Sequence, residues 1–379
     1  MLHLRPERVL LPSGFVAGAG VLIADSVIRA ITRPEGPGPG AERLDLSGDL
    51  VPGFVDLQVN GGGGVLFNDQ PSVEGVAAIA RAHRRFGTTG LLPTLISDDP
   101  EVMAAAIRAV DEAIERGVPG VLGIHLEGPF LNLERKGIHD ASRLRKLDAA
   151  SIDLVSSLRR VRTLVTLAPE LAPPGAIAGL VARGVIVAAG HTAASYEEAR
   201  AAIGEGLTGF THLFNAMSQL GSRSPGAVGA ALDTADAWCG LIVDGRHVHP
   251  AALRVALAAK GAERMVLVTD AMPPVGADAH GFMLNGRPIT VEDGRLTGAD
   301  GTLAGSALDM AQSVRNAVAM LEVDRETALR MASAHPAAAI GLAGVTGSIR
   351  PGLRADLSLL DADGAVERTW IGGAEEAGW

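Results

Sequence analysis

The sequence predicts an α/β protein, a (β/α)8 TIM-like barrel with a small β-sandwich domain formed by the N- and C-terminal segments. Three observations support this fold class. From about residue 51 to residue 343, strand-like apolar runs alternate with Ala-rich stretches of helical character, the pattern of a parallel sheet built from βα units. Eight such runs are present, and eight parallel strands close a TIM barrel. The two ends of the chain share a different pattern, in which short β-type runs alternate with turns.

Both ends of the chain consist of short β-type runs separated by turns, at residues 8–11, 20–24, 27–31, 347–360 and 366–371. A Gly/Pro cluster at 34–40 is typical of a turn or a flexible loop. These features predict one small antiparallel β module in which the two termini meet. We therefore expect residues 1–50 and 344–379 to form the sandwich domain, and residues 51–343 to form the barrel.

The strand-like runs of the middle region have lengths that suit barrel strands. They are residues 50–59, 89–95, 121–127, 163–168, 185–191, 209–213, 239–244 and 265–270. Helices are expected between them, for instance at 73–86, 100–115 and 196–204. No G-x-G-x-x-G follows the first strand, and the four glycines at 61–64 lack that spacing, so a dinucleotide site is not expected.

Composition excludes several classes of function. Hydrophobic residues make up 47% of the chain, but no apolar run approaches the roughly 18 residues of a membrane helix. The balance of 33 basic against 43 acidic residues, without a basic cluster, speaks against nucleic acid as a partner. The first residues lack the pattern of a secretory signal. A single cysteine, Cys239, cannot form an internal disulfide, which fits a reducing cytosol, so we expect a cytoplasmic protein. Cys239 itself is expected to be a buried hydrophobe.

Several predicted strands end in a residue that can do chemistry. Glu127 ends the third, His191 the fifth, His212 the sixth and Asp270 the eighth, and His247 follows the seventh. In a βα barrel the C-terminal ends of the strands share one rim, so these residues are expected to converge there.

Such a group of residues suits metal-dependent hydrolysis. Two histidines and one glutamate are a ligand set that catalytic zinc takes, with one position left for water, whose pKa falls to about 7 on the metal. Asp270 would then accept the proton of that water and return it to a leaving amine. The pattern alone leaves a structural reading open, because a strand-end aspartate is often a helix N-cap. For His125, two residues before Glu127, we prefer a structural role over one beside the metal.

A set of motifs spans the predicted barrel in a definite order. They are residues 125–132 (HLEGPFLN), 136–139 (KGIH), 190–192 (GHT), 211–217 (THLFNAM), 244–248 (DGRHV), 267–271 (LVTDA) and 301–306 (GTLAGS). With them the chain resembles the amidohydrolase superfamily, and within it the N-acetylglucosamine-6-phosphate deacetylase family. Residues 51–56 and 351–356 are similar to the superfamily's junctions with its small β-sandwich.

The resemblance implies roles for individual residues. Glu127, His191 and His212 would bind one divalent metal ion per chain, with zinc expected and iron, cobalt or manganese as alternatives. Asp270 would be the proton shuttle. The implied substrate contacts are His139, Asn215, Ala216, Arg223, His247 and Leu303.

Each of these residues would contact a different part of the substrate. The two histidines would touch the sugar or its phosphate, and Leu303 would line the acetyl-sugar pocket. Backbone amides at Asn215 and Ala216 would help to hold the phosphate. Arg223 would reach the phosphate from a neighbouring subunit, which implies a homodimer or a higher homo-oligomer.

Two positions depart from the superfamily pattern. Where most members carry His-x-His after the first strand, this chain has Gln58 and Asn60, and because amides are poor ligands beside imidazole a single-metal enzyme is expected. Arg246 is the second departure. It is expected either to face solvent or to add positive charge near the phosphate.

The activity that the resemblance implies is hydrolysis of N-acetyl-D-glucosamine 6-phosphate to D-glucosamine 6-phosphate and acetate, in amino-sugar catabolism or recycling. One alternative is the galactosamine isomer of the substrate. Another is hydrolysis of a cyclic amide or deamination of a free base, which the implied phosphate contacts disfavour. A non-catalytic sugar-phosphate sensor is disfavoured because it would not need Asp270.

Overall fold

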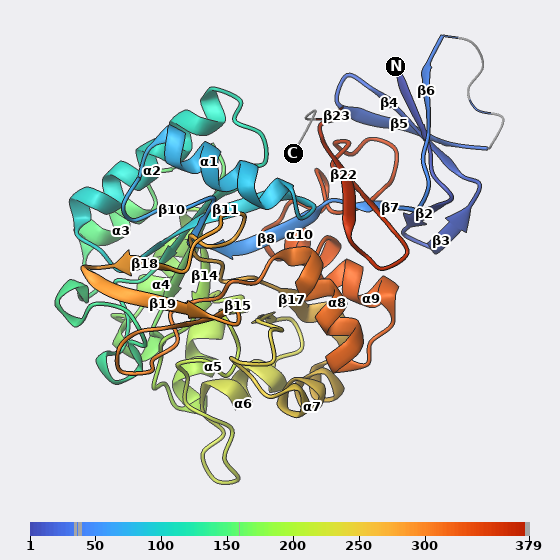
Figure 1. The fold of residues 1–379 in the computed structure, drawn as a ribbon. Helices are drawn as coiled ribbons and strands as arrows, with labels where there is room; N and C mark the ends of the chain where they lie inside the picture. Colours follow the sequence, from blue (N-terminus) through green and yellow to red (C-terminus); the bar gives the residue numbers. More distant parts are fainter. Residues whose placement is uncertain (34–35, 37–39, 159, 376–379) are drawn as a thin grey trace.

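The protein folds into a βα barrel with a separate β domain at one side (Figure 1). The computed structural model describes residues 1–33, 36, 40–158 and 160–375. Eight strands pair in parallel in the order β17-β16-β15-β14-β13-β12-β11-β8. They are β8 (Phe54–Val59), β11 (Thr88–Ile96), β12 (Gly123–Glu127), β13 (Arg162–Leu167), β14 (Ile186–Ala189), β15 (Gly209–Phe210), β16 (Trp238–Leu241) and β17 (Met265–Leu267). The predicted barrel is confirmed.

Helices surround the barrel and pack on its strands through a large apolar cluster. They are α1 (Val73–Arg84), α2 (Pro100–Glu115), α3 (Ala149–Val155), α4 (Ala176–Ala182), α5 (Tyr196–Gly204), α6 (Gly226–Asp233), α7 (Pro250–Lys260), α8 (Met310–Leu321), α9 (Arg325–Met331) and α10 (Ala334–Ala339), with short 3-10 turns η1 (Leu133–Arg135), η2 (Ala141–Arg143), η3 (Pro169–Leu171) and η4 (Ala262–Arg264). The predicted helices at 100–115 and 196–204 are confirmed, and a capping box of Ser195 and Glu198 starts the latter. Among the described residues, no helix has the length and hydropathy to cross a membrane.

The barrel closes between its first and last strands through the residues that follow β17. The N–H of Asp270 donates to the carbonyl of Gln58 at 3.0 Å, and the N–H of Asn60 donates to the carbonyl of Ala271 at 2.9 Å. Val59 and Ala271 form an isolated parallel bridge. We call this line of contacts between β8 and the 268–271 segment the seam. It places Asp270 directly beside the end of β8.

The small domain combines both ends of the chain, as predicted. One sheet has the order β5-β4-β1-β6, with strands β1 (Leu2–Arg5), β4 (Gly20–Ala24), β5 (Val27–Thr32) and β6 (Glu42–Asp45). The other has the order β23-β22-β21-β7-β2-β3, with β2 (Arg8–Leu11), β3 (Gly14–Ala17), β7 (Asp49–Pro52), β21 (Leu357–Leu360), β22 (Val366–Ile371) and β23 (Ala374–Glu375). Side chains from both sheets, including those of Leu4, Ile28, Leu50 and Trp370, form one buried core.

The expectation of an antiparallel module was wrong in part. Strand β1 pairs in parallel with β6, and β2 pairs in parallel with β7. Parallel pairing is possible because the two strands of each pair are connected through other strands rather than by a hairpin. The Gly/Pro cluster at 34–40 lies mostly outside the described residues.

The first predicted barrel strand, 50–59, is two strands in different sheets. Strand β7 belongs to the small domain and β8 to the barrel, with Gly53 between them. A Cβ atom at Gly53 would lie 2.1 Å from Thr89 Oγ1, so only glycine lets the chain pass so close to β11 at this change of sheet.

Two further β elements were not predicted. A short hairpin pairs β9 (Gly61–Gly62) with β10 (Val65–Leu66) directly after β8. A three-stranded antiparallel sheet, β18 (Gly281–Leu284), β19 (Arg287–Glu292) and β20 (Arg295–Thr297), follows the eighth barrel strand.

Candidate active site

The functional residues stand at or just beyond the C-terminal ends of the barrel strands. Glu127 is the last residue of β12 and is fully buried beside Ile96 and Thr166 of the neighbouring strands. His191 follows β14 with a φ of 49°, and Asp270 follows β17 with a φ of 53°. Residues other than glycine seldom adopt this left-handed conformation, which costs roughly 1–2 kcal/mol. It turns the chain away from the strand direction directly at the rim.

Three of these residues bring their ligand atoms together at one point. Glu127 Oε1 lies 3.1 Å from His191 Nε2 and 2.9 Å from His212 Nε2, and the two nitrogens lie 3.1 Å apart. In a tetrahedral zinc site with bonds of about 2.0–2.1 Å, neighbouring ligand atoms are roughly 3.3 Å apart. The observed triangle therefore has the size that a metal ion of this kind requires, and the donor set fits the ion.

The surroundings of the triangle prepare the side chains for ligation. His191 Nδ1 donates to the carbonyl oxygen of Arg135 at 2.8 Å, which leaves Nε2 with its lone pair in the neutral ring. Burial alone would raise the pKa of Glu127, but the close contacts of its carboxylate with His191 and His212 outweigh burial and hold this pKa well below its ordinary value. The carboxylate is therefore ionised, the form that binds metal.

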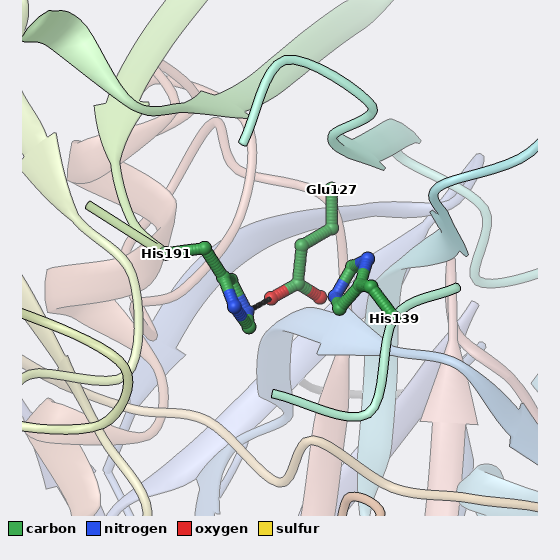
Figure 2. Close-up of side chains that lie close together, drawn as sticks. All are labelled: Glu127, His139 and His191. Carbon is green, nitrogen blue, oxygen red and sulfur yellow. Dashed lines mark hydrogen bonds and ion pairs between the residues drawn. The ribbon is translucent and has the colours of Figure 1, made fainter. Parts of the chain in front are cut away.

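His139 approaches the same carboxylate from the other side, as Figure 2 shows. Glu127, His139 and His191 each offer a ligand atom within 4.8 Å of the others. However, the backbone N–H of Ser97 donates to His139 Nδ1 at 3.3 Å, so the neutral ring carries its hydrogen on Nε2. Burial lowers the pKa of His139 to about 3, which keeps the ring neutral. An Nε2–H group donates hydrogen bonds and has no lone pair for a metal, which favours the predicted role in substrate contact.

Asp270 lies among amide donors. Its Oδ1 accepts hydrogen bonds from Asn60 Nδ2 at 2.6 Å and from Gln58 Nε2 at 3.1 Å, and Gln58 Nε2 also donates to Glu127 Oε2 at 3.1 Å. Burial and the charge of Glu127 raise the pKa of Asp270 to about 6. A carboxyl group with a pKa near neutrality can both accept and return a proton.

A cavity of about 250 Å³ opens over these groups. Nine of the ten residues predicted for the site line it, namely Glu127, His139, His191, His212, Asn215, Ala216, His247, Asp270 and Leu303. His247 is held by a hydrogen bond from its Nδ1 to Asp244 Oδ2 at 2.7 Å. Burial alone would raise the pKa of Asp244, but its hydrogen bonds with His247 outweigh burial and lower it.

The predicted phosphate contacts are only partly available in one chain. The N–H of Asn215 donates to the carbonyl of His212, whereas the N–H of Ala216 has no acceptor among the described residues. Ala216 thus offers the free backbone donor. Arg223 is exposed and lines a separate hollow beside Ser195 and Ser224, so it does not reach the cavity of its own chain.

The cavity has an apolar wall that sequence reasoning did not name. The apolar residues that line the cavity are Ile96, Ile138, Ile242 and Met272, and Thr302 and Gly305 also line it. A Cβ atom at Gly305, where φ is 62°, would lie 2.6 Å from Met272 Cγ and 2.8 Å from the carbonyl oxygen of Asp270. The sequence did contain a signal for some of these residues, since Gly305 and Thr302 belong to the 301–306 motif and Ile242 belongs to a predicted strand.

Three other residues have clear places. His125 bonds through its two ring nitrogens to the carbonyl of Leu57 and the hydroxyl of Thr166, in line with the preferred structural role. Cys239 is fully buried, and burial raises the pKa of its thiol to about 12. Arg246 donates to the carbonyl of Asp293 in the turn between β19 and β20, so it is tied to the three-stranded sheet.

Comparison with known proteins identifies the family of this chain. Residues 50–375 match the amidohydrolase family. The chain belongs to the amidohydrolase family. This amidohydrolase is 46% identical, over 86% of its length and 83% of the relative, to an N-acetylgalactosamine-6-phosphate deacetylase of Shewanella sp. strain ANA-3.

Two solved structures share the whole fold. The N-acetylglucosamine-6-phosphate deacetylase of Pasteurella multocida is 34% identical, with a TM-score of 0.96 over 100% of both chains. An aspartate-to-alanine mutant of the Mycobacterium smegmatis enzyme, in complex with N-acetyl-D-glucosamine-6-phosphate, is 35% identical, with a TM-score of 0.89 over 99% of this amidohydrolase and 98% of that chain.

Below the rim of this amidohydrolase, Asp56 is a fully buried carboxyl group in the middle of β8. Its Oδ2 accepts from Thr269 Oγ1 at 2.5 Å, and its Oδ1 accepts from the backbone N–H groups of Gln58 and Thr269 at 3.2 and 3.3 Å. Burial raises the pKa of Asp56 to about 7, because the hydrogen bonds only partly offset the loss of hydration.

This raised pKa predicts how the stability depends on pH. Between about pH 4 and pH 7 the folded chain holds a proton on Asp56 that the unfolded chain has released, so this group's contribution to stability falls as the pH rises through that window. The melting temperature of the unmodified protein is expected to fall between pH 5 and pH 8 by at least about 2 °C more than that of Asp56→Asn. About two pH units of titration are worth roughly 2.7 kcal/mol, and in a chain of this size ~1 kcal/mol shifts the melting temperature by a little over 1 °C. Equal pH profiles would rule out this titration.

Proposed function

We propose that this chain hydrolyses the acetamide bond of N-acetyl-D-glucosamine 6-phosphate and releases acetate and D-glucosamine 6-phosphate in amino-sugar catabolism or recycling. The observation that carries the proposal is the convergence of Glu127, His191, His212 and Asp270 on one cavity. The relatives, which are named for the deacetylation of N-acetylated hexosamine 6-phosphates, support the choice of substrate class.

Each residue has a task in this reaction. Glu127, His191 and His212 would hold the divalent metal, for which zinc is the first choice. The bound metal would lower the pKa of a water molecule and polarise the acetamide carbonyl. Asp270 would take up the proton of that water and pass it to the departing sugar nitrogen. A single ion is proposed because Gln58 and Asn60 turn amide N–H groups toward the carboxylates, and N–H groups are not ligands.

The remaining contacts would orient the substrate. His139, with hydrogen on Nε2, would donate to the sugar or its phosphate, and His247 would be kept in position by Asp244. The free N–H of Ala216 would donate to the phosphate. Leu303 and the apolar wall would face the acetyl-sugar part of the substrate.

The test is acetate release from N-acetylglucosamine 6-phosphate by the purified protein, before and after chelation, with elemental analysis of the bound metal. Turnover that chelation abolishes, together with about one metal ion per chain, is the expected result. A fully metallated protein that releases no acetate from either hexosamine isomer would refute the proposed substrate, though not the metal site.

The galactosamine isomer is the second candidate substrate, and the 46% identical relative favours it. The two sugars differ only in the direction of one hydroxyl group. Side-by-side values of kcat/KM decide between them, since a site built to hydrogen-bond a hydroxyl rejects the wrong isomer strongly. A ratio of at least about tenfold for the glucosamine form is expected if the first choice is right.

We further propose that the enzyme is a cytoplasmic homodimer in which Arg223 reaches the phosphate in the partner's cavity, which would explain why it lies outside its own. Replacing Arg223 with alanine is expected to raise KM by about 10- to 100-fold, because a charge-assisted bidentate contact is worth about 1.5–3 kcal/mol. Arg108→Ala, which removes an exposed arginine from α2, is the control. A dimer in sedimentation with an unchanged KM in Arg223→Ala would speak against this role.

A further inference from the structure

The seam of the barrel contains a buried polar network that the proposed reaction does not use. Asp56 and Thr269 are fully buried and joined by the 2.5 Å hydrogen bond between Oδ2 and Oγ1. They come from opposite edges of the eight-stranded sheet, since β8 and β17 are its first and last strands. Regular pairing along β17 ends at Leu267, and beyond it the chain is held by the backbone hydrogen bonds of the seam together with this side-chain bond.

Thr269 is the residue directly before Asp270, and both peptide groups beside Asp270 are fixed. The carbonyl of Thr269 accepts a hydrogen bond from Ser306 Oγ at 2.6 Å, and the carbonyl of Asp270 accepts one from the N–H of Ser306 at 2.8 Å. The N–H of Asp270 is bonded to Gln58 across the seam.

This fixation matters because Asp270 has a left-handed backbone, with a φ of 53°. An aspartate on its own would rarely adopt that conformation, and surrounding structure must impose it. Catalytic groups must also stay near their productive position, since an error of about 1 Å can lower a rate roughly 100-fold.

We propose that the Asp56–Thr269 pair positions Asp270, so that losing the Thr269 hydroxyl and its buried hydrogen bond to Asp56 displaces the carboxylate of the proton shuttle. The pair touches neither the cavity nor the residues of the metal triangle. Its loss is therefore expected to lower kcat while KM and the metal content stay the same. This inference rests on the proposed function for its kinetic part only.

The test compares Thr269→Val with Thr269→Ser. Valine keeps the shape of threonine and removes the hydroxyl, whereas serine keeps it. Besides its bond to Asp56, the hydroxyl accepts from the N–H of Ala271 at 3.2 Å and contacts the carbonyl of Gln58 at 3.3 Å. We expect kcat to fall about 10- to 100-fold in Thr269→Val, with KM and metal stoichiometry within twofold of the unmodified enzyme, and to stay within threefold in Thr269→Ser. The matched control is Thr163→Val, because Thr163 is also a buried strand threonine but its hydroxyl has no partner among the described residues.

Crystal structures of the same variants give an answer that does not depend on the substrate. In Thr269→Val the carboxylate of Asp270 is expected to move by about 1 Å or more, and in Thr269→Ser to stay in place. A folded Thr269→Val protein with an unmoved Asp270, or with kcat within threefold of the unmodified enzyme, overturns the proposal. If the unmodified enzyme releases no acetate, the proposed function fails, and the position of Asp270 still decides this inference.

Discussion

Replacing Asp270 with asparagine is expected to lower kcat by about 10²- to 10⁴-fold, the usual contribution of general acid–base catalysis. The amide has almost the shape of the carboxylate and can keep its hydrogen bonding with Asn60 and Gln58, but it cannot take up a proton. Metal content, measured by elemental analysis, is expected to stay at about one ion per chain, because the ligand triangle does not include Asp270.

The control for this change is Asp278→Asn, which makes the same substitution at an exposed position eight residues further along. It should leave kcat within twofold of the unmodified enzyme, as surface substitutions usually do. If Asp270→Asn kept more than a tenth of the activity, Asp270 would not be the proton shuttle.

Replacing His191 with alanine is expected to abolish metal binding. The loss of the metal is expected to lower kcat/KM by at least ~10³-fold. A metal ion supplies several kcal/mol of transition-state stabilisation, and each 1.36 kcal/mol is tenfold in rate. Without this imidazole only Glu127 and His212 of the triangle are left. Elemental analysis after dialysis is the primary measurement, and steady-state kinetics the second.

His249→Asn is the matched control for the histidine change. His249 is exposed and caps the start of α7 through its side chain, a task that asparagine performs as well. The control should keep its metal and its activity. An alanine variant of His191 that still bound one ion per chain would mean that another group, such as His139, serves as a ligand.

The rim of the site could be predicted because it depends on patterns that are local in sequence. Each of the four main residues lies at or next to the end of a predicted strand, and the barrel topology brings those strand ends together. What each residue bonds to could not be predicted in the same way. The contact of Ser97 with His139 that fixes its tautomer, and the bond of Asp56 to Thr269, join distant residues without any local signal.

The three-stranded sheet β18 to β20 was missed by the sequence prediction for a different reason. Its turns contain Asn285-Gly286 and Asp293-Gly294, and all four residues have positive φ. These dipeptides are the strongest short-range signal for a two-residue hairpin, so the sheet could have been predicted from the sequence. The role of Arg223 is open for another reason: the proposed contact joins two chains, and it is tested by the alanine variant.

The order of strands in the small domain has a consequence for the synthesis of the protein on the ribosome. Strand β7 lies between β2 and β21, and about 300 residues separate β7 from its later partner. At 5–20 residues per second, synthesis leaves one side of β7 without a neighbour for roughly 15 to 60 s. An unpaired strand edge is a template for aggregation, so β7 presents an aggregation-prone edge in the nascent chain during that interval.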